Sequence, residues 1–156
     1  METSPYRESG LNKLNLKNVT LWATSWGNDD EITWRTSRVL LYCDSLIEFE
    51  RVVFFSACKK RMCDFPFEII PIRPLDLQKW NIFVNREVPK HITGDFSMSV
   101  HEDGFPIDIR QWRPEFLKYD YIGAPWHDGV VGNGGFNIES KKLMRLKKDL
   151  PYTSEE

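Results

Sequence analysis

The stretch Val19-Thr20-Leu21-Trp22-Ala23 is a short β-prone run that ends at turn-forming residues from Thr24 to Asp30. Arg51 to Phe55 is a continuous apolar run, typical of a strand covered on both faces in a mostly parallel sheet. Between these two runs, apolar residues recur with the spacing of one helix face: Ile32, Thr36, Val39, Leu40, Cys43, Leu46 and Ile47. The three segments predict a β-α-β unit.

The same alternation continues along the chain. Strands are expected at Glu68 to Ile72 and at Asp95 to Val100, where apolar residues alternate with Ser97 and Ser99. Helices are expected at Leu77 to Val88, with Trp80, Phe83 and Val84 facing the core, and at about Ser140 to Leu150, with Leu143, Leu146 and Leu150 on the apolar face. Alternating strands and helices predict a three-layer α/β fold with a mostly parallel central sheet. We expect one domain over residues 18–156, preceded by a flexible leader at residues 1–17.

Composition narrows the classes of function. The 156 residues carry a formal net charge of −2, so the chain lacks the basic field that would hold nucleic acid. No run approaches the roughly 20 apolar residues of a membrane span, and no signal sequence is evident, so a cytoplasmic protein is expected. The odd number of cysteines, Cys43, Cys58 and Cys63, favours free buried thiols in a reducing compartment.

The end of the strand at Asp95 to Val100 carries the first candidate site, His101-Glu102-Asp103-Gly104. If strand pairing persists to Asp103, the side chains of His101 and Asp103 point to the same face. An imidazole and a carboxylate suit Mn²⁺ or a similar divalent ion, and Gly104 permits a sharp turn beside a ligand. The alternative is a strand end with solvated charges.

A second candidate is the glycine-dense segment from Gly129 to Gly135. Glycine allows a ligand to approach the backbone closely, but no Gly-Lys-Ser/Thr follows, so this is not a P-loop. The alternative is a long turn that leads into the last strand and helix. The motifs of serine hydrolases and zincins are absent from the sequence, which leaves metal-assisted group transfer as the expected chemistry.

The segments Trp112 to Trp126 and Val131 to Phe136 carry a resemblance to a known family. They contain Tyr-Asp-Tyr-Ile-Gly-Ala-Pro-Trp and Gly-Asn-Gly-Gly-Phe in that order. The pattern resembles a family of uncharacterised proteins, assigned as glycosyltransferases, from bacteria, algae and large viruses. The resemblance runs from about Val19 to the carboxyl end, and is strongest from Asp95 to Ile138. It implies a Rossmann-like GT-A fold that binds a nucleotide sugar beside Mn²⁺ or Mg²⁺.

The resemblance also implies roles for particular residues. Asp103 corresponds to the family's acidic metal ligand, whereas His101 departs from the commonest form of that triplet. Asp120 lies in the Tyr-Asp-Tyr segment and is expected to brace that turn, with catalysis as the alternative. The donor and acceptor contacts implied are Thr24, Ser25 and Trp26 for the nucleotide, and Asn133, Gly134 and Gly135 for the acceptor or the transferred sugar.

An inverting transferase also requires a carboxylate base for the acceptor hydroxyl. By position, the resemblance places that base at Glu155 or Glu156. Two alternatives stay open, namely that the domain extends beyond residue 156, because GT-A domains are usually longer, and that these glutamates are only an acidic terminus.

The sequence therefore predicts a hexosyl- or deoxyhexosyltransferase that uses a UDP- or GDP-linked donor and a glycan or other hydroxyl acceptor. A non-catalytic module that binds sugar nucleotides or glycans is the first alternative. A metal-dependent phosphohydrolase is the second, although a lone His-Glu-Asp triplet supplies few carboxylates for it.

Overall fold

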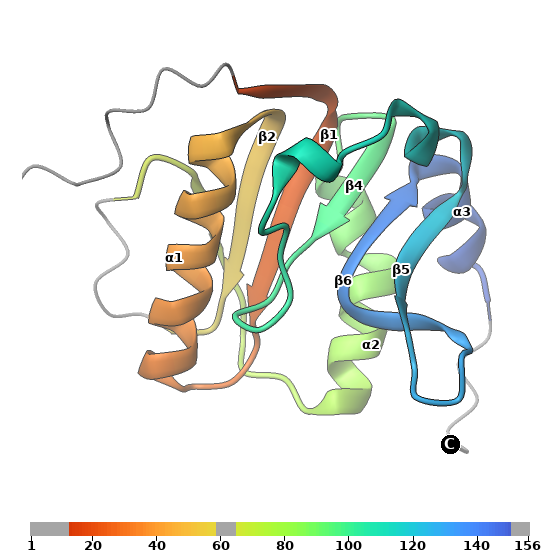
Figure 1. Ribbon diagram of the computed structural model, residues 1–156. Coiled ribbons are helices and arrows are strands. Elements are labelled where there is room, and N and C mark those ends of the chain that lie inside the picture. Colours follow the sequence, from red (N-terminus) through yellow and green to blue (C-terminus); the bar gives the residue numbers. More distant parts are fainter. Residues whose placement is uncertain (1–12, 59–64, 151–156) are drawn as a thin grey trace, which may run out of the picture.

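A six-stranded mixed sheet organises residues 13–58 and 65–150, which are the residues that the computed structural model describes (Figure 1). The order across the sheet is β3-β2-β1-β4-β6-β5. The strands are β1 (Leu14–Ser25), β2 (Ile47–Ser56), β3 (Glu68–Pro71), β4 (Phe96–Ser99), β5 (Tyr121–Pro125) and β6 (Val131–Ser140). The predicted α/β class is confirmed.

The sheet has a parallel part and an antiparallel part. β1 pairs in parallel with β2 and β4, and β2 with β3, whereas β6 runs antiparallel to both β4 and β5. The prediction of a mostly parallel sheet is therefore not confirmed. The reason is the short turn between Pro125 and Val131, which joins β5 to β6 as a hairpin and contains Gly129 at φ 83°. The expected glycine loop is thus largely the beginning of β6.

Helices cover both faces of the sheet (Figure 1). α1 (Asp30–Leu46) lies on one face, and α2 (Leu77–Arg86) and α3 (Lys141–Lys147) lie on the other. Three short 3-10 helices complete the elements: η1 (Val88–His91), η2 (Ile109–Gln111) and η3 (Pro114–Lys118). Within the described part of the chain, no helix combines the length and the apolar character that crossing a bilayer requires.

Two expected boundaries are wrong. β1 begins at Leu14, so residues 14–17 belong to the central strand and not to a leader, while residues 1–12 lie outside the described part. Ile47 begins β2 and does not end α1, because its backbone is already extended at φ −127° and ψ 135°.

The expected apolar faces of two helices also need correction. Ile32 in the first turn of α1 is 40% exposed, and Leu146 in α3 is 62% exposed. Met144 anchors α3 instead, since it is buried against Trp22 and Val88. A period of 3.6 residues marks a helix more reliably than it marks which residues reach the sheet.

The core consists of two clusters, one on each face. Leu21, Leu40 and Met98 belong to the cluster beneath α1, which the segment from Phe105 to Leu117 also covers. Trp22 and Phe55 belong to the cluster beneath α2, η1 and α3. Because both faces are packed, the central strands have no solvent-facing side.

The serines of β4 show how this second face is built. Ser97 and Ser99 alternate with apolar residues as expected, yet both are buried, because α2 and α3 cover the polar face of β4. A polar layer therefore lies between the sheet and these two helices.

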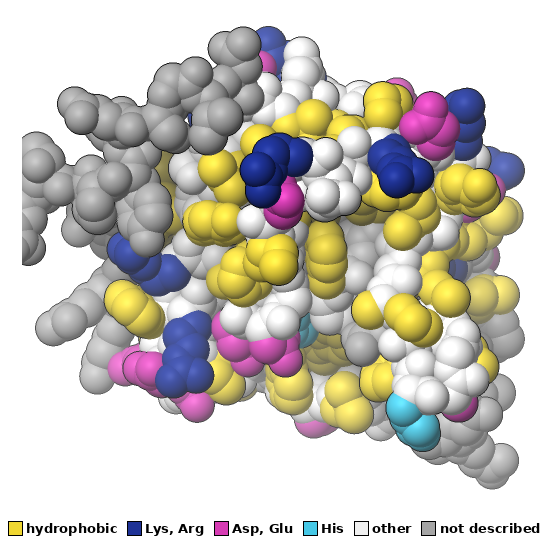
Figure 2. Space-filling view, viewed as in Figure 1, with side chains coloured by type: hydrophobic (Ala, Val, Ile, Leu, Met, Phe, Trp, Pro, Cys, Tyr) yellow, Lys and Arg dark blue, Asp and Glu magenta, His cyan; other side chains and the backbone are white. Residues whose placement is uncertain are grey.

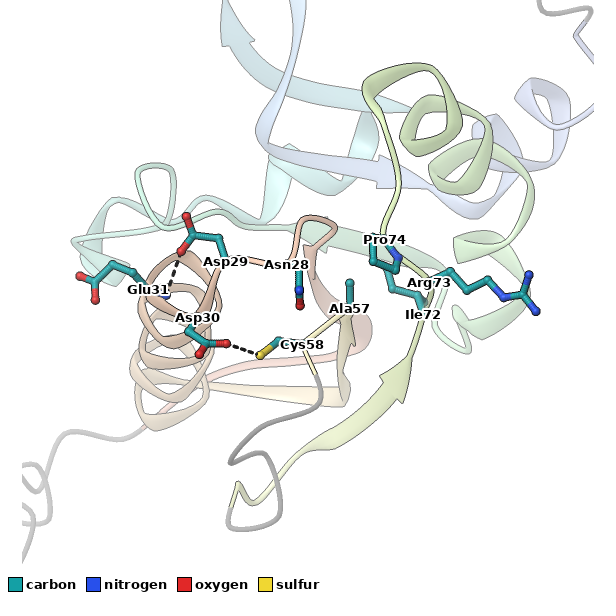
Figure 3. A pocket seen from close by; sticks show the side chains of 9 residues that line it. All are labelled: Asn28, Asp29, Asp30, Glu31, Ala57, Cys58, Ile72, Arg73 and Pro74. Carbon is teal, nitrogen blue, oxygen red and sulfur yellow. Dashed lines mark hydrogen bonds between the residues drawn. The ribbon is translucent and has the colours of Figure 1, made fainter.

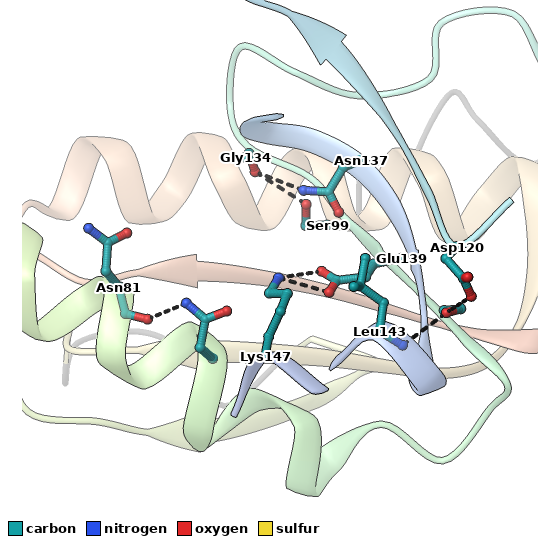
Figure 4. Close-up of polar contacts among 10 residues, drawn as sticks. Asn81, Ser99, Asp120, Gly134, Asn137, Glu139, Leu143 and Lys147 are labelled. Carbon is teal, nitrogen blue, oxygen red and sulfur yellow. Dashed lines mark hydrogen bonds and ion pairs between the residues drawn. The ribbon is translucent and has the colours of Figure 1, made fainter. Parts of the chain in front are cut away.

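The charged part of this layer is the pair formed by Glu139 of β6 and Lys147 of α3 (Figure 4). The Lys147 ammonium lies 2.8 Å from each carboxylate oxygen of Glu139, whose side chain is only 7% exposed. The Glu139–Lys147 pair fixes the last turn of α3 to the sheet.

The buried Glu139 carboxylate also acts on a neighbouring strand. Burial, with a further contribution from Glu139, raises the pKa of Tyr121 above its ordinary value.

Replacing Lys147 by Met should lower the free energy of unfolding by about 2 kcal/mol, because it leaves the buried Glu139 carboxylate without a counter-charge. Lys142→Met is the matched control. Its ammonium is exposed and lies 3.4 Å from Asp120, so the loss should stay below about 0.5 kcal/mol. Urea unfolding followed by tryptophan fluorescence measures both, and equal losses would contradict the role given to the buried pair.

Gly94→Ala should destabilise the fold by about 2 kcal/mol or more, because the new Cβ would overlap the carbonyl oxygen of Asn18 and lie 2.7 Å from its carbonyl carbon. Gly27→Ala is the control, since a Cβ there meets nothing within 4 Å. The same urea titration should show Gly27→Ala unchanged or more stable by up to about 1 kcal/mol.

Candidate functional site

The candidate site lies at the carboxyl ends of the parallel strands. From β1 the chain passes to β2 on one side through α1, and β4 returns to the other side of β1 after α2. Open α/β sheets bind ligands outside the carboxyl ends of their strands, at the point where the connections diverge. In this sheet that point is the end of β1, at Ser25 and Trp26 (Figure 1).

The first component is a tight turn directly after β4. The N–H of His101 donates to the carbonyl of Gly104 at 2.9 Å, and the N–H of Gly104 donates back at 3.2 Å. The strand expected to run through Asp103 is thus replaced by a turn with Glu102 and Asp103 at its centre. The turn brings one ligand atom from each of His101, Glu102 and Asp103 within 4.8 Å of one another.

This triplet fits a divalent cation. Ligands on opposite sides of Mg²⁺ or Ca²⁺ lie about 4 to 5 Å apart, which is twice a metal–oxygen distance, so a spread of 4.8 Å is suitable. The Nε2 atom of His101 is buried and has no hydrogen-bond partner among the described residues. An unsatisfied buried group of this kind costs about 1 to 3 kcal/mol, which coordination to a metal would offset.

Trp80 of α2 forms the second component. Its indole N–H donates to the hydroxyl of Thr24 at 2.9 Å. Its ring centroid lies 6.2 Å from that of the His101 ring, in an edge-to-face arrangement, and 6.4 Å from that of the Trp26 ring. Sequence periodicity assigned Trp80 to the core together with Phe83, because both lie on one face of α2. The signal that could have placed Trp80 in the site is its position along the chain, because it lies in the first turn of a helix that begins at the carboxyl ends of the parallel strands.

The three residues expected at the nucleotide differ in accessibility. Thr24 and Ser25 are 3% and 1% exposed, and the Ser25 hydroxyl lies 2.5 Å from that of Thr33 in α1. Trp26 is partly exposed, and its carbonyl accepts a hydrogen bond from the N–H of Leu75 at 2.8 Å. The buried side chains of Thr24 and Ser25 therefore support the loop, whereas Trp26 presents an aromatic surface that a ligand can reach.

The glycine segment forms the third component, because β6 brings it alongside the end of β4 (Figure 4). The carbonyl of Gly134 accepts hydrogen bonds from Ser99 at 3.3 Å and from Asn137 at 3.4 Å. A Cβ added to Gly104 would come within 3.2 Å of the carbonyl oxygen of Gly135. Asn133 pairs through its backbone with Ala124.

Two further predictions concern acidic residues. Glu155 and Glu156, the expected bases, lie outside the described residues. Asp120 accepts a hydrogen bond from the Ser140 hydroxyl at 2.6 Å, and this contact, with Lys142, holds the pKa of Asp120 below its ordinary value. Ser140 in turn caps α3 by accepting from the N–H of Leu143, so the contact is of the bracing kind expected for Asp120.

A cleft of about 800 Å³ lies at the ends of β1, β2 and β3, and none of the three components lines it (Figure 3). Among the described residues, its charged side chains are Asp29, Asp30, Glu31 and Arg73. Asp29 already accepts hydrogen bonds from the first free N–H groups of α1, at 2.9 and 3.0 Å. The described part of its wall, with three carboxylates and one guanidinium, favours a ligand rich in hydrogen-bond donors over a phosphate.

A second hollow, of about 650 Å³, lies on the α1 side of the sheet over β4, β6 and β5. Hydrophobic side chains gather on this face, as Figure 2 shows. Met98, Trp112, Ile122 and Phe136 are among its walls. Because its lining is almost wholly apolar, this hollow does not suit the charged part of a ligand.

No protein-family model matches the sequence, and no curated protein is significantly similar to it.

The two described thiols, Cys43 and Cys58, differ in their surroundings. Burial, with a smaller contribution from Asp44, raises the pKa of Cys43 to about 12, whereas Cys58 lies in the cleft wall and donates its S–H to Asp30 at 2.7 Å. Both are free and buried, as expected, and Cys63 lies outside the described residues.

At pH 8, iodoacetamide should modify Cys43 of the native protein at least about a hundredfold more slowly than Cys43 of the urea-unfolded chain, because only the thiolate reacts. Cys58 should be modified before Cys43. Peptide mass spectrometry over a time course measures both rates, and equal labelling of Cys43 in the two states would contradict its burial.

Proposed function

We propose that the chain is a metal-assisted glycosyltransferase that moves a sugar from a nucleoside-diphosphate sugar to a hydroxyl of a glycan or another acceptor. The observation that carries the proposal is the convergence of His101, Glu102 and Asp103 at the end of β4, across the end of β1 from the cleft. The order β3-β2-β1-β4 supports a GT-A-like assignment, because a doubly wound nucleotide-binding sheet of order 3-2-1-4-5-6 begins with the same four strands.

In this proposal the cleft beyond β1 and β2 receives the nucleoside. Its volume lies in the range of small-molecule sites. The carboxylates of Asp30 and Glu31 accept hydrogen bonds from ribose hydroxyls or base amino groups, and they repel phosphates. Trp26 does not line the cleft, but its ring packs on that of Trp80, which in turn contacts His101, so it supplies an aromatic surface on the side of the metal triplet.

The diphosphate then extends toward His101 and Asp103, which would hold the cation. When bound there, Mn²⁺ or Mg²⁺ would supply positive charge that stabilises the leaving diphosphate. Asp103 is exposed and contributes the anionic ligand, and His101 contributes its buried, unpartnered nitrogen. Gly134 and Gly135 leave space for the sugar because they carry no side chains, and Asn133 borders the same space.

The base for the acceptor hydroxyl is proposed at Glu155 or Glu156. Glu139 does not fit that task, because its carboxylate is buried and paired with Lys147. Because the pairing removes Glu139 as a candidate base, it also favours the second candidate function, a module that binds sugar nucleotides or glycans without catalysis. Hydrolysis of a bound donor, or its transfer to an acceptor, distinguishes the enzyme from the module.

Calorimetric titration of UDP- and GDP-sugars, with and without Mn²⁺, tests the donor site. Binding should require the metal, and Asp103→Ala should weaken Mn²⁺ binding by at least about tenfold and remove the metal dependence. Glu48→Gln is the control, since Glu48 lies near the amino end of β2, at the opposite edge of the sheet. If no donor in the panel binds under either condition, the proposal is wrong.

A further inference from the structure

We infer that Trp80 is a positioning residue: its ring holds the imidazole of His101 in the orientation that lets His101 and Asp103 share one divalent cation. The inference rests on the proposed metal site. α2 supplies no metal ligand in this proposal, yet through Trp80 it takes part in metal binding.

The imidazole of His101 is oriented by a ring contact. Its buried Nε2, the nitrogen proposed to bind the metal, makes no hydrogen bond to any residue that the structure describes, so Nε2 does not itself fix the ring. The ring contact that His101 does make is with Trp80, with centroids 6.2 Å apart and planes at 87°. This edge-to-face packing restricts rotation of the imidazole.

Trp80 is itself fixed by contacts on several sides. Its indole N–H donates to Thr24, which is 3% exposed at the end of the central strand. Its backbone N–H donates to Asp76 at 2.8 Å, within the first turn of α2. The Trp26 ring packs at 43° to the Trp80 ring, and a Cβ placed on Gly134 would lie 3.9 Å from the indole. Trp80 is therefore held on several sides before it meets His101.

The contacts of Trp80 have a consequence for the affinity of the site for a metal ion. The contacts run from Thr24 through Trp80 to His101, so they connect the end of β1 with the turn after β4. Without the ring, the imidazole gains rotational freedom that metal binding must remove. Loss of Trp80 should therefore weaken metal binding even though Trp80 supplies no ligand atom.

The experiment compares Mn²⁺ affinity, measured by calorimetry, in the full chain and in three variants. Trp80→Met removes the ring but keeps much of the volume, and should weaken binding about tenfold. Trp80→Phe keeps an aromatic ring but loses the bond to Thr24, and should stay within about threefold of the parent. Trp34→Met, at a tryptophan of α1 that is 57% exposed, should leave the affinity unchanged.

A spectroscopic measurement separates positioning from general loosening. Electron spin-echo modulation should show imidazole nitrogen coupled to bound Mn²⁺ in the parent and in Trp80→Phe. The coupling should be weakened or lost in Trp80→Met, although Asp103 still binds the ion. Trp80→Leu gives the same test if Trp80→Met does not fold, and melting temperatures establish which variants are folded.

The outcomes distinguish the two claims. A parent chain that binds no Mn²⁺ overturns the metal site and, with it, the role of Trp80. A parent that binds Mn²⁺ with nitrogen coupling, together with a Trp80→Met variant of equal affinity and equal coupling, overturns the role of Trp80 alone and leaves the proposed function intact.

Discussion

The position of β1 between two parallel neighbours is the constraint on which the rest of the structure depends. Residues 19–25 are all buried, because strands pair with both edges of β1 and helices cover both of its faces. Two connections that diverge from one strand leave their loops at the same edge of the sheet. The cleft, Trp26 and the turn after β4 lie together for this reason.

The site differs on its two sides in a way that follows from the sheet. On the β2 side, the loops follow parallel strands, and their polar groups cap α1 or line the cleft. On the β4 side, the chain arrives from the opposite direction in β6, so the beginning of a strand borders the site. Glycine is suited to that place because the backbone of Gly135 passes close to Gly104. Acidic side chains thus dominate the first side, and backbone groups contribute to the second.

Sequence predicted the parallel half of the fold well. The apolar run ending at Phe55 and the alternation around Met98 are strong strand signals, because burial on both faces leaves little choice of residue. The hairpin of β5 and β6 was missed, since glycine weakens strand propensity and pairing with neighbours decides its conformation.

The candidate site was predicted in the same uneven way. The metal triplet was found from residue types, yet its convergence comes from a turn at His101 and not from strand alternation. Trp80 was assigned to the core because periodicity cannot distinguish a helix face that meets the sheet from one that meets a site.

The hairpin also has a consequence for the order in which the molecule assembles. Pro125 pairs with Val131 across a short turn, whereas Met98 pairs with Ile138 and Leu14 with Ile47, far along the chain. Contacts between near neighbours close faster than distant ones. We therefore expect the unit of β5, β6 and α3 to form locally and to dock onto β4 late in folding. The cation ligands and the glycines would then meet only when two separately formed halves join.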